Sequence, residues 1–182
     1  AENDQFTISA SGANIWGTSD EFHFAWMKLS GDFILYTRLE FPEAGGNAHR
    51  KAGIMFRESL DPSSPYADVV LHGDGLTSLQ YRPLMGAETS EIKSIQQHFT
   101  ILQLRRQGTT IVASAAHDKE PLQEIGRIEM GEKGKDFYAG IFVCSHDPER
   151  TEKAVFSNVR LTIPAPEGFV PYRDFIGSRL EI

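Results

Sequence analysis

Tyrosine, arginine, aspartate and histidine side chains recur at strand-like spacing and could together bind a sugar. Tyr66, Asp68 and His72 alternate along residues 66–72, so they share one face of an extended strand. Aromatic faces pack against the apolar side of a pyranose ring, while Asp, Arg and His side chains bond its hydroxyls. On a concave sheet, such groups on adjacent strands would form a glycan-binding groove. The candidate ligand-binding residues are Tyr36, Arg38, Tyr66, Asp68, His72, Tyr81 and Arg82.

Several of these residue types have an equally good structural interpretation. Each tyrosine could be a core aromatic with its hydroxyl at the edge of the core. Arg57 is interpreted as a brace that bonds backbone carbonyls or a carboxylate, because an unpaired buried charge is costly. The alternative is that Arg57 faces the groove. Gly53 and Gly140 lie inside strands, where a bulge or close packing beneath an aromatic ring is favoured over ligand contact.

The spacing of acidic and nucleophilic residues does not favour catalysis. A retaining glycosidase needs two carboxyl groups roughly 5–5.5 Å apart, which a Glu-x-Asp-x-x-Glu strand pattern supplies. No complete copy occurs, and the nearest fragment is Glu2-Asn3-Asp4. Gly-x-Ser-x-Gly and His-Glu-x-x-His are also missing. A glycoside hydrolase with an unrecognised carboxylate pair is therefore kept as an alternative that ranks below the two non-catalytic functions given at the end of this section.

No metal or cofactor site is predicted. Four aspartates lie in expected turns, where oxygen-rich loops can hold Ca²⁺, but their spacing matches no calcium loop and structural calcium has no motif to support it. These are Asp32, Asp61, Asp74 and Asp147. Cys144 is the only cysteine, so an internal disulfide is excluded.

The candidate residues lie on a predicted β-meander at residues 51–83. Three alternating runs, 52–58, 66–72 and 76–82, are separated by a proline-rich break and a Gly73-Asp74-Gly75 turn. Further strands are predicted at residues 5–11, 21–29, 33–41, 98–106, 109–117, 122–130, 137–144 and 152–163. Residues 12–17 are expected to form a loop, and residues 86–97 a loop or one helical turn. About twelve strands with little helix indicate an all-β, two-sheet antiparallel sandwich.

Two strands carry the clearest facial patterns. Phe22, Phe24 and Trp26 alternate along residues 21–29, and this aromatic trio is expected in the core. The run 33–41 places Phe33 and Leu39 on an apolar face, with Tyr36 and Arg38 on the opposite one.

Composition excludes some partners. The chain has 182 residues, 18 basic and 25 acidic, for a net charge of −7, which disfavours nucleic acid. No apolar run approaches the roughly 20 residues of a membrane helix. We expect one domain at residues 1–163, followed at 164–182 by a proline-rich linker and the start of a further domain.

Several segments resemble the regulation-of-enolase-protein-1-like family, a branch of the concanavalin A-like lectin/glucanase superfamily. The resemblance is carried by Gly31-Asp32-Phe33, by residues 51–62 (KAGIMFRESLDP) and by Gln80-Tyr81-Arg82. Residues 102–108 (LQLRRQG) and 138–146 (YAGIFVCSH) agree with it, and together the segments span about residues 20–163.

The resemblance implies a jelly-roll sandwich of two curved antiparallel sheets, secreted or periplasmic and often attached to other modules. It supplies no catalytic set, because the activity of the family is largely unassigned. Residues 118–122 (DKEPL) depart from the family, which typically has an Asp-Gly turn followed by tryptophan, so any site that depends on that aromatic is in doubt. The tail is similar to the junction that precedes TolB-like β-propeller repeats.

Two function classes therefore lead. The first is a non-catalytic module that binds a poly- or oligosaccharide, in an extracellular or periplasmic protein. The second is a protein-docking or spacer domain that positions a following propeller, for which a large exposed apolar patch is expected.

Overall fold

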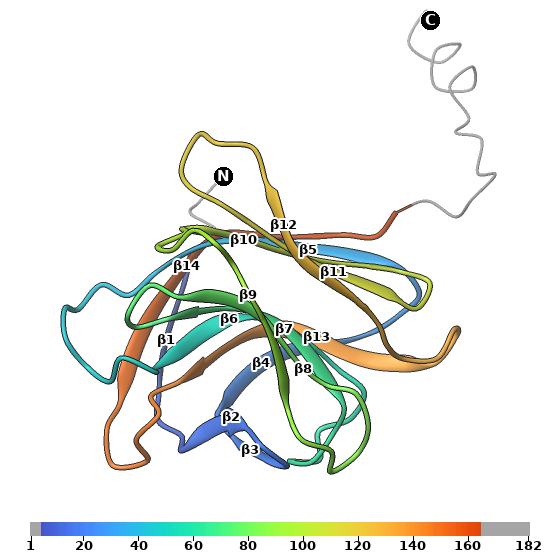
Figure 1. Ribbon diagram of the computed structural model, residues 1–182, viewed down its shortest axis with the longest axis horizontal. Helices are drawn as coiled ribbons and strands as arrows, with labels where there is room; N and C mark the ends of the chain where they lie inside the picture. Colours follow the sequence, from blue (N-terminus) through green and yellow to red (C-terminus); the bar gives the residue numbers. More distant parts are fainter. Residues whose placement is uncertain (1–4, 165–182) are drawn as a thin grey trace, which may run out of the picture.

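The protein is a sandwich of two six-stranded antiparallel sheets (Figure 1). The computed structural model describes residues 5–164. The first sheet has the order β1 (Gln5–Ala10), β14 (Glu152–Thr162), β5 (Phe33–Glu40), β10 (Ile101–Gln107), β11 (Thr110–Ala116) and β12 (Gln123–Glu129). The second has the order β4 (His23–Ser30), β13 (Asp136–Cys144), β6 (Lys51–Arg57), β7 (Tyr66–His72), β8 (Thr77–Arg82) and β9 (Ser90–Lys93). The predicted all-β sandwich is confirmed.

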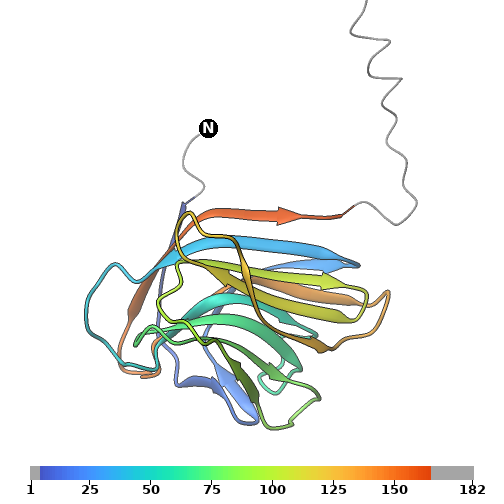
Figure 2. The same cartoon turned by 45° about the horizontal axis from the view of Figure 1, so that its top comes forward.

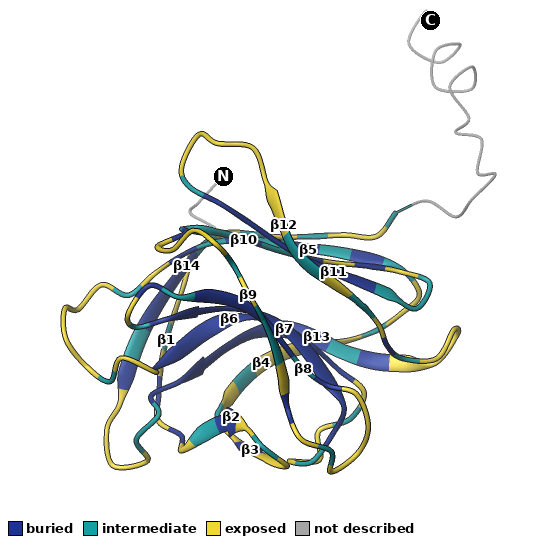
Figure 3. Cartoon of the chain, viewed as in Figure 1, coloured by how far each residue is buried: buried dark blue, intermediate teal, exposed yellow. Residues whose placement is uncertain are grey.

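A short hairpin covers the second sheet from outside. It consists of β2 (Asn14–Trp16) and β3 (Ser19–Glu21), and Figures 1 and 2 show it on the side of the second sheet that faces away from the first. β2 lies within residues 12–17, where a loop was expected. β3 ends at Glu21, the residue at which the predicted strand 21–29 begins. Because the hairpin covers the outer face and the first sheet covers the inner face, β6 and β7 are buried at every residue (Figure 3).

The core lies between the two sheets. Leu35 and Leu39 of β5 face Ile54 of β6 and Val69 of β7 in one continuous cluster. Along β5, buried residues alternate with half-buried ones, as the sequence pattern predicted. The predicted meander is also confirmed, since β6, β7 and β8 are hydrogen-bonded neighbours in that order.

The expectation that Phe22, Phe24 and Trp26 belong to the core is wrong. Phe22 and Phe24 pack on the outer face of the second sheet, in a separate small cluster around Phe142, and Trp26 is 45% exposed. The reason is that these side chains lie on the face of β4 that points away from the first sheet, because Phe24 and Trp26 pair with Phe142 and Gly140 on the outer face of β13.

The segment 86–97 contains a strand rather than a helical turn. Within residues 5–164 the structure has no helix at all, and so none that is long and apolar enough to cross a membrane. The predicted linker and following domain begin at residue 164, and nearly all of that stretch lies outside the described residues.

Candidate functional site

Four of the seven candidate residues come together on the outer face of the second sheet. Strand register pairs Tyr66 with both Arg57 and Arg82, and Asp68 with Gln80. Since paired residues in neighbouring strands point to the same side, Tyr66, Asp68 and Arg82 share one face. His72 lies further along β7 on the same face. All four are at most 4% exposed, so the hairpin β2–β3 and the loops beside it separate them from solvent.

Asp20 of the hairpin organises one end of this buried layer. Its carboxylate accepts hydrogen bonds from Arg57 Nη1 at 2.7 Å and from Arg82 Nη1 and Nη2 at 2.8 and 2.6 Å. Arg82 also donates to the carbonyl oxygens of Gly17, Ser64 and Ala87. The two arginines therefore hold the hairpin and its neighbouring loops onto the sheet, and Arg57 is placed as a brace.

Tyr66 lies between the two guanidinium groups. Their carbon atoms are 5.8 and 5.0 Å from its ring centroid, which is the range of cation–π contact. The Tyr66 hydroxyl is 3.2 Å from Thr89 Oγ1, and burial raises the pKa of this phenol well above its usual value. A hydroxyl so placed supports the fold and has no direct path to a ligand.

A second group of polar side chains surrounds Asp68 and His72. The Gln80 amide nitrogen donates to Glu91 Oε1 at 2.9 Å and lies 3.3 Å from His72 Nε2. His72 Nδ1 lies 3.2 Å from the carbonyl oxygen of Leu76. An imidazole that accepts at Nε2 and donates at Nδ1 is neutral, in agreement with burial lowering the pKa of His72 to about 4. Burial also raises the pKa of the Asp68 carboxyl.

The other three candidate residues lie elsewhere. Tyr36 and Arg38 are half-buried on the outer face of the first sheet, where Arg38 pairs with Asp118 at 2.7 Å. Tyr81 points inward and packs against the main core. The sandwich therefore separates the seven residues into three places, and no groove unites them.

The glycines singled out by the sequence lie at close approaches between neighbouring groups. A Cβ on Gly53 would overlap the carbonyl of Val69 and press on the ring of Phe142. A Cβ on Gly140 would overlap the backbone of Ala25 and Trp26.

An exposed aromatic surface lies on the outer face of β4 and β13. The β4 aromatic surface, as we name it, consists of Phe22, Phe24, Trp26 and Tyr138. Trp26 and Tyr138 meet edge to face with ring centroids 4.8 Å apart, and Phe22 and Phe24 lie 5.9 Å apart. A cavity of about 400 Å³ adjoins it, lined also by Glu21 and Arg57. The surface thus offers solvent-accessible rings with polar groups beside them.

Sequence reasoning had the signal for this surface but assigned it to the wrong side. Period-two alternation correctly put Phe22, Phe24 and Trp26 on one face. It could not tell that this face points outward, because that depends on the register of β4 against β13, which places Phe24 opposite Phe142 of the outer-face cluster.

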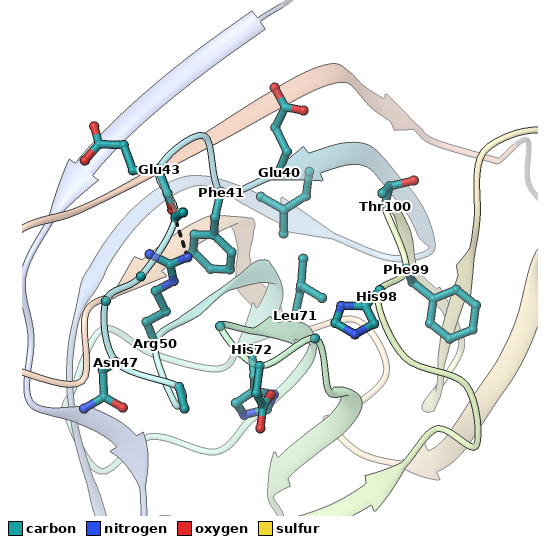
Figure 4. A pocket seen from close by; sticks show the side chains of 18 residues that line it. Glu40, Phe41, Glu43, Asn47, Arg50, Leu71, His72, His98, Phe99 and Thr100 are labelled. Carbon is teal, nitrogen blue, oxygen red and sulfur yellow. Dashed lines mark hydrogen bonds between the residues drawn. The ribbon is translucent and has the colours of Figure 1, made fainter.

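An open cavity of about 530 Å³ lies at one end of the sandwich (Figure 4). Arg50 forms part of its wall and is already engaged, since it donates to Glu152 at 2.6 Å and lies 4.3 Å from the ring centroid of Phe41. His98, with a left-handed backbone (φ 61°), packs against Gly75 on the other side. This cavity offers a histidine and loop carbonyls, but no exposed aromatic face like that of Trp26.

Acidic residues gather at the opposite end. A cavity of about 750 Å³ is lined there by Glu58, Glu129, Glu132 and Asp136. Three of the four are engaged: Glu129 with two threonine hydroxyls, Glu132 with Lys135 and Asp136 with Lys28. Burial raises the pKa of Glu58. Among residues 5–164 no group of three or more His, Cys, Asp or Glu side chains could hold a metal ion.

Comparison with known proteins identifies the fold without a family. No family model matches the sequence, and no curated protein sequence matches it. A solved structure of a functionally unknown protein from Saccharomyces cerevisiae is 16% identical with a TM-score of 0.69, covering 88% of this chain and 89% of that one.

Two further solved structures have names that refer to carbohydrates or lectins. The carbohydrate-binding module CBM66 from Bacillus subtilis is 17% identical with a TM-score of 0.50, covering 87% of this chain and 95% of that one. A legume lectin-like domain from Entamoeba histolytica is 10% identical with a TM-score of 0.53, covering 88% and 90%. At such identities the likeness concerns the fold alone. The chain has the β-sandwich fold of the concanavalin A-like lectins and glucanases.

Proposed function

We propose that this chain is a non-catalytic carbohydrate-binding module and that the β4 aromatic surface is its binding site. We further propose that it is a member of the regulation-of-enolase-protein-1-like family and acts outside the cytoplasm. The observation that carries the binding proposal is the exposure of Trp26 beside Tyr138, on a face bordered by charged groups.

The chemistry of this surface suits a sugar. An exposed indole packs against the apolar face of a pyranose. The Tyr138 hydroxyl and the Lys28–Asp136 pair, whose atoms are 2.8 Å apart, could bond the hydroxyls at its rim. The carbohydrate-binding module and the lectin-like domain of the same fold are in keeping with this function, but by analogy of fold only.

The previously predicted residues take a supporting role in this proposal. Tyr66, Asp68, His72 and Arg82 lie beneath the hairpin, so they would stabilise the outer face and not touch the ligand. The proposed function is non-catalytic, because three of the four acidic side chains that line the 750 Å³ cavity are already bonded to threonine or lysine side chains.

The test is isothermal titration of the 182-residue chain with soluble β-glucans, fructans and uronate polymers. We expect binding to at least one class and at least a tenfold loss of affinity for Trp26→Ala, which is about 1.4 kcal/mol. Tyr36→Ala is the matched control, since Tyr36 is a half-buried aromatic on the outer face of the other sheet.

Two results would contradict the proposal. Absence of binding across all three glycan classes would remove the function. Loss of binding in Tyr36→Ala with full binding in Trp26→Ala would move the site to the first sheet.

A docking domain is the second candidate function. The observation that favours it is an apolar crevice on the other face of β4, lined by Met27, Phe6 and Leu161. If the chain serves mainly to hold a neighbouring module, glycan titrations will detect no binding. Substitutions of the residues that line this crevice will then weaken the contact with that module.

A further inference from the structure

Lys51, the first residue of β6, is a buried lysine that lies against the hairpin β2–β3. The residue is 3% exposed, and no ion pair within residues 5–164 includes it. Lysine is almost never buried so completely unless it is paired. Its Nζ instead donates to Asn14 Oδ1 at 3.0 Å and to the carbonyl oxygen of Ile15 at 2.7 Å, both in β2. Burial lowers the pKa of Lys51 and so favours the neutral amine, which is the nucleophilic form.

The side chain of Asn14 presents a carboxamide to this amine. Its Oδ1 accepts a hydrogen bond from the backbone N–H of Ile15 at 2.8 Å as well as the bond from Lys51. A backbone N–H held in this position polarises the C=O group and stabilises the oxyanion that forms when an amine attacks Cγ. Among residues 5–164, the hydrogen bonds of the Asn14 amide all involve Oδ1 and leave Nδ2 unbonded. Asn14 is half-buried, so a small molecule released from its side chain has a path to solvent.

Asp68 supplies a buried acid on the same face of the sheet. Lys51 pairs with His72 across β6 and β7, and Asp68 lies on the same side of β7 as His72. Asp68 is fully buried, and its Oδ2 has no hydrogen-bond partner in the part of the chain that the structure describes. Burial raises the pKa of the Asp68 carboxyl. After burial itself, Asp68 has the largest effect on the pKa of Lys51, so the two groups lie within electrostatic reach of each other.

We propose that Lys51 and Asn14 join in an intramolecular isopeptide bond that fastens the hairpin β2–β3 to β6. The neutral amine of Lys51 attacks Asn14 Cγ, so that an Nζ–Cγ bond forms and the Cγ–Nδ2 bond breaks. Nζ loses one proton, and Nδ2 gains one and leaves as ammonia. Asp68 carries this proton from one nitrogen to the other, which is the general acid–base step that the exchange of one amide for another requires. The reaction consumes no oxidant, reductant or cofactor.

The bond would give the hairpin a covalent attachment that a disulfide cannot provide, since Cys144 is the only cysteine. Asn14 and Lys51 are 37 positions apart in the sequence. A cross-link that closes a loop of this length reduces the conformational freedom of the unfolded chain and so stabilises the folded one. The hairpin covers the buried layer around Asp20, Arg57 and Arg82, so the cross-link would also hold that cover closed.

Mass spectrometry of the denatured 182-residue chain tests the bond. We expect the wild-type protein to be lighter than its sequence by one ammonia molecule, and Lys51→Arg and Asn14→Ala to have their full sequence masses. Lys28→Arg is the matched control, because Lys28 is a lysine of the same sheet that is bonded to Asp136. This variant should still lose ammonia.

A tryptic digest locates the bond. Trypsin does not cleave after a lysine whose amine is acylated, so the wild type should yield residues 1–28 joined to residues 51–57 as one branched peptide. The full sequence mass for the wild type overturns the proposal. Loss of ammonia without this branched peptide also overturns it, because the ammonia then comes from another side chain.

Asp68→Asn tests the proton transfer separately. An asparagine keeps the shape of the side chain but cannot carry the proton. We expect the bond to form at least tenfold more slowly in this variant, followed by mass from the time of synthesis, while urea denaturation shows that the variant is folded. Bond formation at the wild-type rate would remove Asp68 from the reaction. Glycan titration is independent of all these results, since Trp26 belongs to β4 and not to the hairpin.

Discussion

Asp20 is the single anion that two buried guanidinium groups share. Its side chain is fully buried, and those of Arg57 and Arg82 are at most 2% exposed. Removing one member of a buried charge network leaves the others desolvated and unpaired, which costs more than the pair contributes. The residue also ties β3 to two strands of the sheet, so its loss affects the hairpin as well as the arginines.

We therefore expect Asp20→Asn to lower the free energy of unfolding by about 3–5 kcal/mol, measured by urea denaturation. Asp118→Asn is the control, because it breaks the Arg38–Asp118 pair, whose side chains are 38% and 54% exposed. That change should cost at most about 1 kcal/mol. A similar decrease in the free energy of unfolding in both variants would mean that the buried pairs of Asp20 with Arg57 and Arg82 stabilise the fold no more than an exposed pair does.

His72 makes stability depend on pH. Its pKa is about 4 in the folded protein, mainly because of burial and secondarily because Lys51 lies nearby, whereas Leu76, Glu91 and Asp74 act in the opposite direction. An unfolded histidine titrates near 6.5, so the folded state binds fewer protons between these values. The contribution is therefore complete above pH 6.5 and is lost as pH falls from 6.5 to 4.

The loss should approach about 3 kcal/mol at pH 4, from roughly 1.4 kcal/mol per pKa unit. His72→Gln has no proton to gain, so its stability should fall less steeply over this range than that of the wild type. Unfolding midpoints in urea at several pH values measure the difference. Parallel pH profiles for the two proteins would assign the dependence to other groups, such as His146, whose pKa burial also lowers.

Among the secondary-structure elements, the alternation of apolar and polar residues was sufficient to predict the position of the long strands. The predicted runs 66–72 and 33–41 correspond to β7 and β5 almost residue for residue. Turn residues ended these runs because glycine and proline fix the local backbone. The short strands were missed because three or four residues show no reliable period. The hairpin β2–β3 depends on partners far away in sequence, such as Lys51, which bonds to the carbonyl of Ile15 at 2.7 Å.

The candidate site was less predictable than the strands that carry it. Period two shows which side chains share a face but not whether that face meets water, the opposite sheet or a covering loop. Tyr66 and Trp26 illustrate the difference. Tyr66 was a candidate ligand-binding residue with an equally good interpretation as a core aromatic, and it is fully buried, whereas Trp26 was expected in the core and is 45% exposed. Both outcomes depend on strand order and on the hairpin, which no local pattern encodes.

At the scale of the whole molecule, the sheets combine local and distant pairings. The meander β6–β7–β8 joins neighbours in sequence, as in the pair Val69 and Leu79. The first sheet is completed by β1 against β14, where Ile8 lies opposite Ala154. Closing the longer loop costs about 2 kcal/mol more in chain entropy. The meander should therefore form before the transition state for folding, and the pairing of β1 with β14 after it.

This order predicts opposite kinetic effects for two truncations in the same core. Leu79→Ala in β8 should mainly slow folding, because its contacts are formed in the transition state. Ile8→Ala in β1 should mainly speed unfolding, with the folding rate nearly unchanged. Stopped-flow measurements in urea give both rates for each variant. The order fails if Ile8→Ala slows folding in proportion to its full loss of stability, since the two ends of the chain would then meet early, despite the entropy of the loop between them.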